Sequence, residues 1–247
     1  MKKWVVLTSI CLTLFVGCSA RNTQPSVSPT LAETATVPQK LEETPTNETN
    51  ENMIIPDLKT IPEGKVWKGY IEVVNLIEIE GASAIEIDNG NFNIIWLDGF
   101  EFTHGTIEFD AKGKTQPPQG SFVGIAFRVV DEITYDAVYF RPFNFGVPDA
   151  ERRAHAVQYV SSPEWPWDQL RAKYPGQYEQ PVEPAPDGDM WFHVKIEIEG
   201  GEIRVFVNNA EEPALQVTEL SGRSGGSVGL YCYGYGVISN LQITPAR

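Results

Sequence analysis

Cysteine, histidine and positive charge are scarce in this 247-residue chain. It has three cysteines and three histidines, and 19 Lys and Arg against 33 Asp and Glu give a formal net charge of −14 at pH 7. No Cys and His cluster has the spacing of a zinc site, and there is no glycine-rich phosphate loop. The acidic balance argues against nucleic acid as a partner and against docking on anionic lipid. The sequence therefore predicts neither a nucleic-acid partner nor a specific cofactor.

Long apolar runs are also missing, except for one at the N-terminus. Residues 4–16 form an apolar stretch behind Lys2 and Lys3. A membrane-spanning helix needs about 20 apolar residues, so this run is too short. A short apolar run after a positive start has the layout of an export signal. Removal of the two lysines with the signal would leave the mature chain still more acidic.

Cys18 directly follows this signal. The Gly17-Cys18 pair resembles the end of a bacterial lipoprotein signal, which implies that residues 1–17 are removed and that Cys18 carries the lipid. The lipid would be the chain's single membrane contact and would hold it in the cell envelope, facing outside the cytoplasm. Ser19 after the cysteine resembles the outer-membrane sorting pattern where two membranes are present. The alternative is an ordinary secretory signal cleaved near residues 19–20.

The part of the chain after Cys18 divides by composition. Residues 18–52 are rich in Thr, Ser, Pro, Asn, Gln and Glu and contain no aromatic residue, which predicts a disordered linker. A glycosylated stalk is the alternative. Residues 53–247 suit one large β domain better than two small ones. Only Cys232 lies in this domain, so no internal disulfide is expected there.

The domain has alternating apolar and polar residues and no helical periodicity over three turns. Residues 77–80 and 85–88 alternate cleanly, and so do residues 192–198 and 203–207, which a Gly-Gly pair joins. Two alternating runs across such a pair predict a hairpin. Many antiparallel strands without helices predict an all-β fold, either a two-sheet sandwich or a barrel.

Four segments together resemble the concanavalin A-like lectin/glucanase superfamily. They are GTIEFD at 105–110, GIAFR at 124–128, WFHVKI at 191–196 and GSVGLY at 226–231. The resemblance covers residues 67–245 and implies an antiparallel two-sheet β-sandwich of the jelly-roll type. Laminin G-like domains and the domain of 3-keto-disaccharide hydrolases are the most similar members. Because these motifs mark hairpins and core positions, they favour a fold more than a function.

The catalytic acids of the superfamily's glucanases are not complete in this sequence. Retaining glucanases of the superfamily carry Glu-x-Asp-x-x-Glu on one strand, where one carboxylate attacks and another protonates. Glu108-Phe109-Asp110 begins this pattern, but Gly113 stands at the position of the last Glu. The sequence does not support the glucanase mechanism, and whether the protein is an enzyme stays open.

A polar and aromatic cluster falls on the central strands. If Val138 and Phe140 point into the core, their neighbours point to the opposite face. The same alternation on two further strands adds one residue each to that face, and it turns His155 inward. The residues predicted to share the face are Arg128, Tyr139, Arg141 and Gln158.

A long insertion after these strands contains Trp165-Pro166-Trp167. Long loops in a compact domain are commonly binding loops, and the aromatic residues argue against disorder here. Indole and phenol rings stack on sugar rings, and Arg and Gln bind hydroxyls. The predicted substrate-binding set is therefore Arg128, Tyr139, Arg141, Gln158, Trp165 and Trp167. The alternative is that the tryptophans pack the loop onto the sheet and that Arg141 forms a structural ion pair.

These features predict a lipid-anchored, lectin-like protein that binds carbohydrate on a concave sheet face and an aromatic loop. One alternative is a glycan hydrolase or lyase that resembles the 3-keto-disaccharide hydrolases. Another is a protein-interaction module like the laminin G domains. Asp187-Gly188-Asp189 offers oxygen ligands for calcium, but the same tripeptide is typical of a turn.

Overall fold

The computed structural model describes residues 52–79 and 81–247. The predicted signal, Cys18 and the linker as far as residue 51 lie outside the described residues. Among the residues described, no helix has the length and apolar character needed to cross a membrane.

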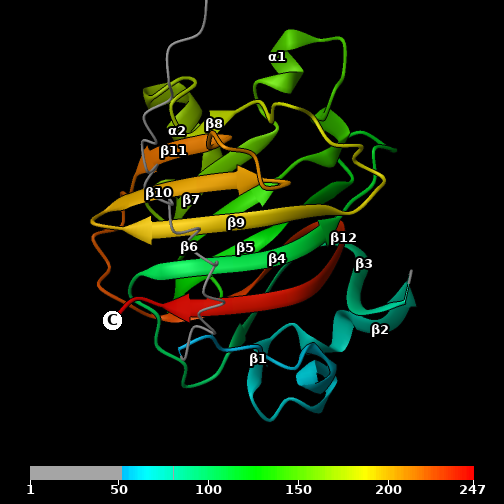
Figure 1. Ribbon diagram of the computed structural model, residues 1–247, viewed down its shortest axis with the longest axis vertical. Coiled ribbons are helices and arrows are strands. Elements are labelled where there is room, and N and C mark those ends of the chain that lie inside the picture. Colours follow the sequence, from blue (N-terminus) through cyan, green and yellow to red (C-terminus); the bar gives the residue numbers. More distant parts are fainter. Residues whose placement is uncertain (1–51, 80) are drawn as a thin grey trace, which may run out of the picture. The chain divides into compact units, whose positions relative to one another are not determined.

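Strands dominate this part of the chain (Figure 1). The strands are β1 (Trp67–Gly69), β2 (Val74–Ile79), β3 (Ala82–Leu97), β4 (Gly105–Lys112), β5 (Ser121–Val129), β6 (Tyr135–Phe140), β7 (Val157–Ser162), β8 (Glu179–Gln180), β9 (Phe192–Glu199), β10 (Glu202–Val207), β11 (Leu215–Thr218) and β12 (Ser227–Pro245). The helices are short: α1 (Ala150–Arg153), α2 (Trp167–Lys173) and the 3₁₀ turns η1 (Leu58–Glu63), η2 (Ile71–Val73) and η3 (Pro142–Asn144).

The strands form two layers, and the long strands β3 and β12 run through both. The first sheet has the order β11-β10-β9-β4-β12-β3-β2, and the second has the order β8-β7-β6-β5-β12-β3-β1. Figure 1 shows β9, β10 and β4 in front of β5, β6 and β7. Strand β12 changes layer at Gly234, which has a φ of 74° beside a register shift against β3. The predicted antiparallel two-sheet sandwich is confirmed.

Alternate side chains fill the space between the layers. Ile107 and Phe109 of β4 are fully buried there, as are Val138 and Phe140 of β6. This alternation is the one expected from the sequence, because each strand turns every second residue toward the core. The large aromatic side chains with less than 2% exposure include Trp67, Phe102, Phe109, Phe127, Phe140, Tyr159 and Phe192.

The β9–β10 hairpin has the turn that the Gly-Gly pair predicts. Glu199 pairs with Glu202, which leaves two residues in the turn. Gly200 and Gly201 have φ values of 58° and 83°. Two consecutive positive φ angles define the type I′ turn, whose twist matches that of antiparallel strands and which favours glycine.

Candidate functional site

One row of side chains crosses the outer face of the second sheet. Tyr139 pairs with Gln158 and Gln158 pairs with Glu179, whereas Gly124 lies between Tyr139 and Tyr231. Because Gly124 has no side chain, the two tyrosine rings stack across it at a centroid distance of 4.6 Å and an interplanar angle of 5°. The cross-strand register therefore brings residues from four strands into one surface.

Arg141 lies on the same face, two residues beyond Tyr139. Its Nη2 donates to the Tyr139 hydroxyl at 3.0 Å and to Gln158 Oε1 at 2.7 Å, and its Nη1 donates to the His155 carbonyl at 2.9 Å. Only 7% of the Arg141 side chain is exposed. A guanidinium with this many fixed partners has its charge held in one position before any ligand arrives.

Glu179 is the negative charge beneath the arginine. Its side chain is 2% exposed, and Arg171 of α2 holds it with two bonds, Nε to Oε1 at 2.7 Å and Nη2 to Oε2 at 2.6 Å. His155 Nδ1 lies 2.9 Å from Oε2, and Arg141 Nη1 lies 3.8 Å from it. A buried carboxylate needs such partners to offset its lost hydration. The contact also fastens α2, and with it the insertion, onto the sheet.

Two groups at this site have shifted pKa values. Burial is the main reason that the pKa of Tyr139 rises to about 12, so its phenol stays protonated at neutral pH. It accepts a bond from Arg141 and keeps its own O–H to donate. Loss of hydration is the main cause that lowers the pKa of His155, against the opposing charge of Glu179. This shift favours the uncharged form of His155.

A cavity of about 580 Å³ opens above this row. Its base on the sheet consists of Phe92, Phe122, Tyr139, Arg141, Tyr231 and Tyr233. Its loop side includes Asn144, Arg152, His155, Trp167 and Arg171. Trp167 is 49% exposed and Tyr233 is 41% exposed, so two large rings remain in contact with water here. The volume lies in the range of about 300–1,000 Å³ that is typical of small-ligand sites.

The structure brings four of the six residues proposed from the sequence to this site. Tyr139, Arg141 and Trp167 line the cavity, and Gln158 is buried beneath Arg141. Trp165 points elsewhere: its ring lies 5.7 Å from that of Tyr174, with the Lys173 ammonium over it at 4.6 Å.

Sequence reasoning missed Glu179, left Arg171 and Arg152 out of the predicted binding set, with Arg152 assigned to an exposed turn, and placed His155 on an inward face. His155 lies instead at the cavity, because β7 begins at Val157 and the residues before it form α1 and a turn. Strand alternation therefore does not apply to His155. The position of Arg171 could have been predicted from the sequence. It follows Trp167 by four residues and so lies on the same face of a helix. Arg171 indeed lies over the Trp167 ring at 4.9 Å.

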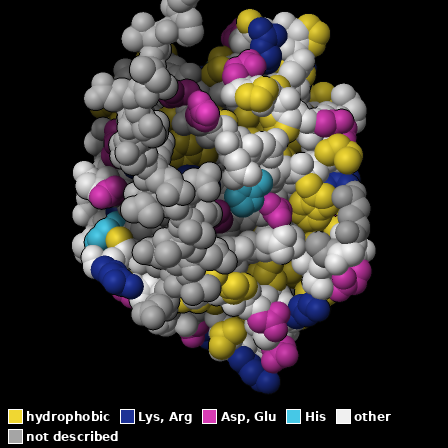
Figure 2. All heavy atoms as spheres, in the orientation of Figure 1, with side chains coloured by type: hydrophobic (Ala, Val, Ile, Leu, Met, Phe, Trp, Pro, Cys, Tyr) yellow, Lys and Arg dark blue, Asp and Glu magenta, His cyan; other side chains and the backbone are white. Residues whose placement is uncertain are grey.

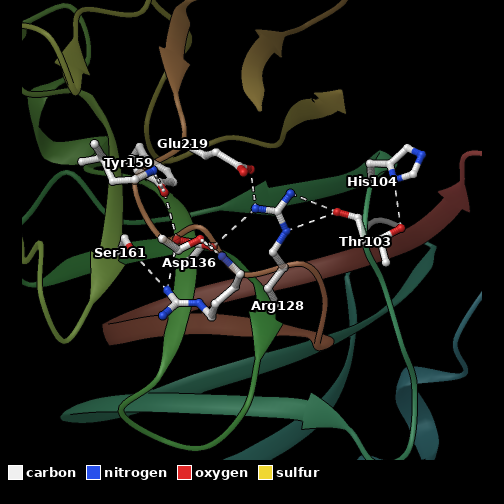
Figure 3. Close-up of polar contacts among 10 residues, drawn as sticks. Thr103, His104, Arg128, Asp136, Tyr159, Ser161 and Glu219 are labelled. Carbon is white, nitrogen blue, oxygen red and sulfur yellow. Dashed lines mark hydrogen bonds and ion pairs between the residues drawn. The ribbon is translucent and has the colours of Figure 1, made fainter. Parts of the chain in front are cut away.

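Arg128 belongs to a different cluster, at one end of the sandwich (Figure 3). Its Nη1 pairs with Glu219, and its Nε and Nη2 donate to the Thr103 carbonyl at 3.2 and 3.0 Å. Asp136 lies 3.9 Å from Nη1. Arg128 is 4% exposed and does not line the cavity.

The expected alternation fails at Arg128 because β5 bulges there. The register against β12 shifts between Ser227 and Val228, and Arg128 has a φ of 51°. An extra residue in one strand turns its side chain away from the face that alternation predicts. Gly226 packs on the bulge, since a Cβ there would lie 2.6 Å from the Arg128 carbonyl carbon.

The incomplete glucanase motif, Glu108-Phe109-Asp110, has its two carboxylates on the outer face of the first sheet. His193 Nδ1 is 2.9 Å from Asp110 Oδ1, and His193 Nε2 is 3.4 Å from Glu108 Oε2. Figure 2 shows this side of the molecule, where acidic side chains and histidine lie among apolar ones. These two carboxylates are thus on the opposite layer from the cavity.

Asp187-Gly188-Asp189 forms a turn. Asp187 Oδ1 accepts from the Asp189 N–H at 2.9 Å, and Asp189 Oδ1 accepts from the Thr115 N–H at 2.9 Å. The bonds from Thr115 are the main reason that the pKa of Asp189 is lowered. The tripeptide therefore joins two loops.

No protein-family model matches the sequence, and no curated protein matches it. Solved structures do share its fold. A Crh5 transglycosylase in complex with NAG has a TM-score of 0.51 at 12% identity, over 80% of this chain and 86% of that one. A sialidase has a TM-score of 0.52 at 10% identity, over 79% of this chain but 18% of its own. The carbohydrate-binding module CBM66 from Bacillus subtilis has a TM-score of 0.46 at 16% identity, over 72% of this chain and 95% of the module. At these identities the likeness to the transglycosylase and the sialidase, both with TM-scores above 0.5, shows the fold alone.

Proposed function

We propose that this chain is an exported carbohydrate-binding protein whose ligand lies in the cavity over the second sheet. The observation that carries the proposal is that exposed aromatic rings and polar side chains fixed by hydrogen bonds line the same cavity. Tyr233 and the part of the Trp167 ring that Arg171 leaves uncovered offer flat apolar faces to a sugar ring, and Arg141 and Tyr139 line the same cavity as hydrogen-bonding groups. A cavity of mostly aromatic lining with a few convergent polar groups is the usual form of a ligand site.

The fold supports the proposal in one respect. The Crh5 transglycosylase with this fold is a complex with NAG, so a sandwich of this kind accommodates a sugar. The position of the sugar site on this chain is argued from its own cavity, because fold does not fix function.

The residues of the cavity support glycan binding better than they support glycoside hydrolysis. Most glycoside hydrolases use two carboxyl groups that flank the bond to be cleaved. The acid beside this cavity, Glu179, already has both oxygens bonded by Arg171. A carboxylate held this way is a poor nucleophile and a poor proton donor, so its role is to position the arginines.

Trp167→Ala is expected to weaken glycan binding about fivefold to thirtyfold, which corresponds to a stacking contribution of about 1–2 kcal/mol. A glycan array identifies a bound glycan, and isothermal titration then gives the dissociation constant of each variant. Trp165→Ala is the matched control, because this tryptophan is two residues away and packs on Tyr174 outside the cavity. Equal losses of affinity in both variants, or a loss in Trp165→Ala alone, would argue against the cavity as the glycan site.

We also propose that a lipid on Cys18 tethers the protein to the cell envelope. Cys18→Ala should then move the protein from the membrane pellet to the soluble exported fraction, because one signal-derived anchor is lost. Cys11→Ala is the control: Cys11 lies inside the signal segment, so that variant should stay in the pellet. Pellet retention of Cys18→Ala would refute the anchor and would leave the cavity proposal untouched.

A further inference from the structure

The cavity is cationic although the chain is strongly acidic. The whole sequence has a formal net charge of −14, yet Arg141, Arg152 and Arg171 line this one cavity. The lining residues include no Asp or Glu. Glu179 behind the cavity offsets one of the three positive charges. Such a local excess of charge on a protein of opposite sign concentrates anions at the site.

Neutralisation of Glu179 does not account for all three arginines. Arg171 holds both oxygens of Glu179, whereas Arg141 reaches it only at 3.8 Å. Arg152 bonds elsewhere, from Nε to Asn144 Oδ1 at 3.3 Å and from Nη2 to the Phe143 carbonyl at 2.8 Å. Arg152 therefore has no acidic partner among the residues described.

Each of the two loop arginines has a nitrogen left for a ligand. Arg171 donates from Nε and Nη2 to Glu179, and Arg152 donates from Nε and Nη2 to its two partners. In both arginines, Nη1 makes no hydrogen bond within the described part of the chain. Both guanidinium groups are oriented by the bonds they already make. Oriented arginine donors suit a planar carboxylate or a sulfate, and bonds between charged partners are the strong ones.

We propose that the cavity binds acidic glycans, and that Arg152 and Arg171 bind the carboxylate or sulfate group while the sugar ring stacks on the exposed aromatic residues. This inference rests on the proposed carbohydrate-binding function and specifies its ligand class. Arg141, which is fixed by Tyr139 and Gln158, serves the hydroxyls next to the acidic group.

The test begins with a glycan array that contains neutral, carboxylated and sulfated glycans. Matched pairs then isolate the charge: oligogalacturonate against its methyl ester, sialyllactose against lactose, and a sulfated array glycan against its unsulfated parent. We expect the acidic member of at least one pair to bind at least tenfold more tightly, and its affinity to fall as NaCl rises. The pair that responds distinguishes carboxylate from sulfate as the natural group.

Arg152→Gln is expected to weaken binding of the acidic glycan roughly tenfold to a hundredfold, the range for loss of a charge-assisted bond. Arg152→Lys should retain part of the affinity because it keeps the charge. Arg153→Gln is the matched control, since Arg153 bonds to the Val147 and Pro148 carbonyls and does not line the cavity. Thermal melting of each variant confirms that it is folded.

Two negative results have different meanings. Equal affinity for the neutral and acidic members of every pair, with Arg152→Gln unchanged, would overturn the acidic-ligand inference and leave a carbohydrate-binding protein. No binding to any class of glycan would overturn the proposed function and this inference with it.

Discussion

Glu179→Ala is expected to lower the free energy of unfolding by about 3–5 kcal/mol, the cost of breaking a buried ion pair on one side. Glu179 is 2% exposed and contacts Arg171, His155 and Arg141. Its removal leaves the Arg141 guanidinium without the negative charge beside it. Arg141 is 7% exposed and cannot regain water as easily as the half-buried Arg171. Stability is measured by urea unfolding. Such a loss is a large part of the total stability of a domain of this size.

Glu183→Ala is the control for that experiment, because Glu183 is an exposed acid a few residues further along the same segment. It should change stability by less than about 0.5 kcal/mol. Glu179→Ala should also weaken glycan binding, since Arg171 and Arg141 lose the carboxylate that positions them. A Glu179→Ala protein of unchanged stability would mean that the arginines are hydrated rather than paired.

The parts of the fold that could be predicted are those with local signals. The β9–β10 hairpin follows from two alternating runs around Gly200-Gly201, and the turn has the two positive φ angles that such a pair favours. The common face of Tyr139, Arg141 and Gln158 follows from alternation in β6 and β7 alone. In both cases the pattern of neighbours in sequence is enough to place the side chains.

Other parts of the site depend on contacts between distant segments. Glu179 lies in β8, which has only two residues, too few for any alternation to be recognised. Its burial is due to Arg171 in α2 and to the pairing of β8 with β7. The prediction for Arg128 fails for a related reason. The bulge that turns its side chain depends on β12, about 100 residues later in the chain.

Two buried ionic clusters thus flank the second sheet, and they predict separable effects. The Glu179 cluster is on the outer face, where it supports the cavity. The Asp136 cluster is on the inner face at one end of the sandwich, where Arg223, Ser221 and Tyr159 converge on one carboxylate. A change in the first should affect stability and binding together, whereas a change in the second should affect stability alone.

Asp136→Ala is accordingly expected to cost about 3–5 kcal/mol of unfolding free energy in urea titration. Asp136 is fully buried, accepts from Arg223 Nη2 at 3.1 Å and from the Tyr159 hydroxyl at 2.9 Å, and lies 3.9 Å from Arg128 Nη1. Its loss leaves the Arg223 guanidinium and the Tyr159 phenol without their shared acceptor and removes a negative charge near Arg128. The segment that contains Ser221 and Arg223 would also lose its attachment to β6.

The role of Asp136 is decided by comparing the parent with three variants: Asp136→Ala, Glu132→Ala, and Asp136→Ala combined with Arg223→Ala. Glu132→Ala, on the exposed turn before β6, should be as stable as the parent. Asp136→Ala combined with Arg223→Ala should recover part of the lost stability, because the double change removes a charge that the single change leaves unpaired. Glycan affinity measured at low temperature, where the variant is folded, should equal that of the parent, since Asp136 is on the opposite face of the sheet from the cavity. A loss of affinity without a loss of stability would contradict this separation and would connect the inner cluster to the binding site.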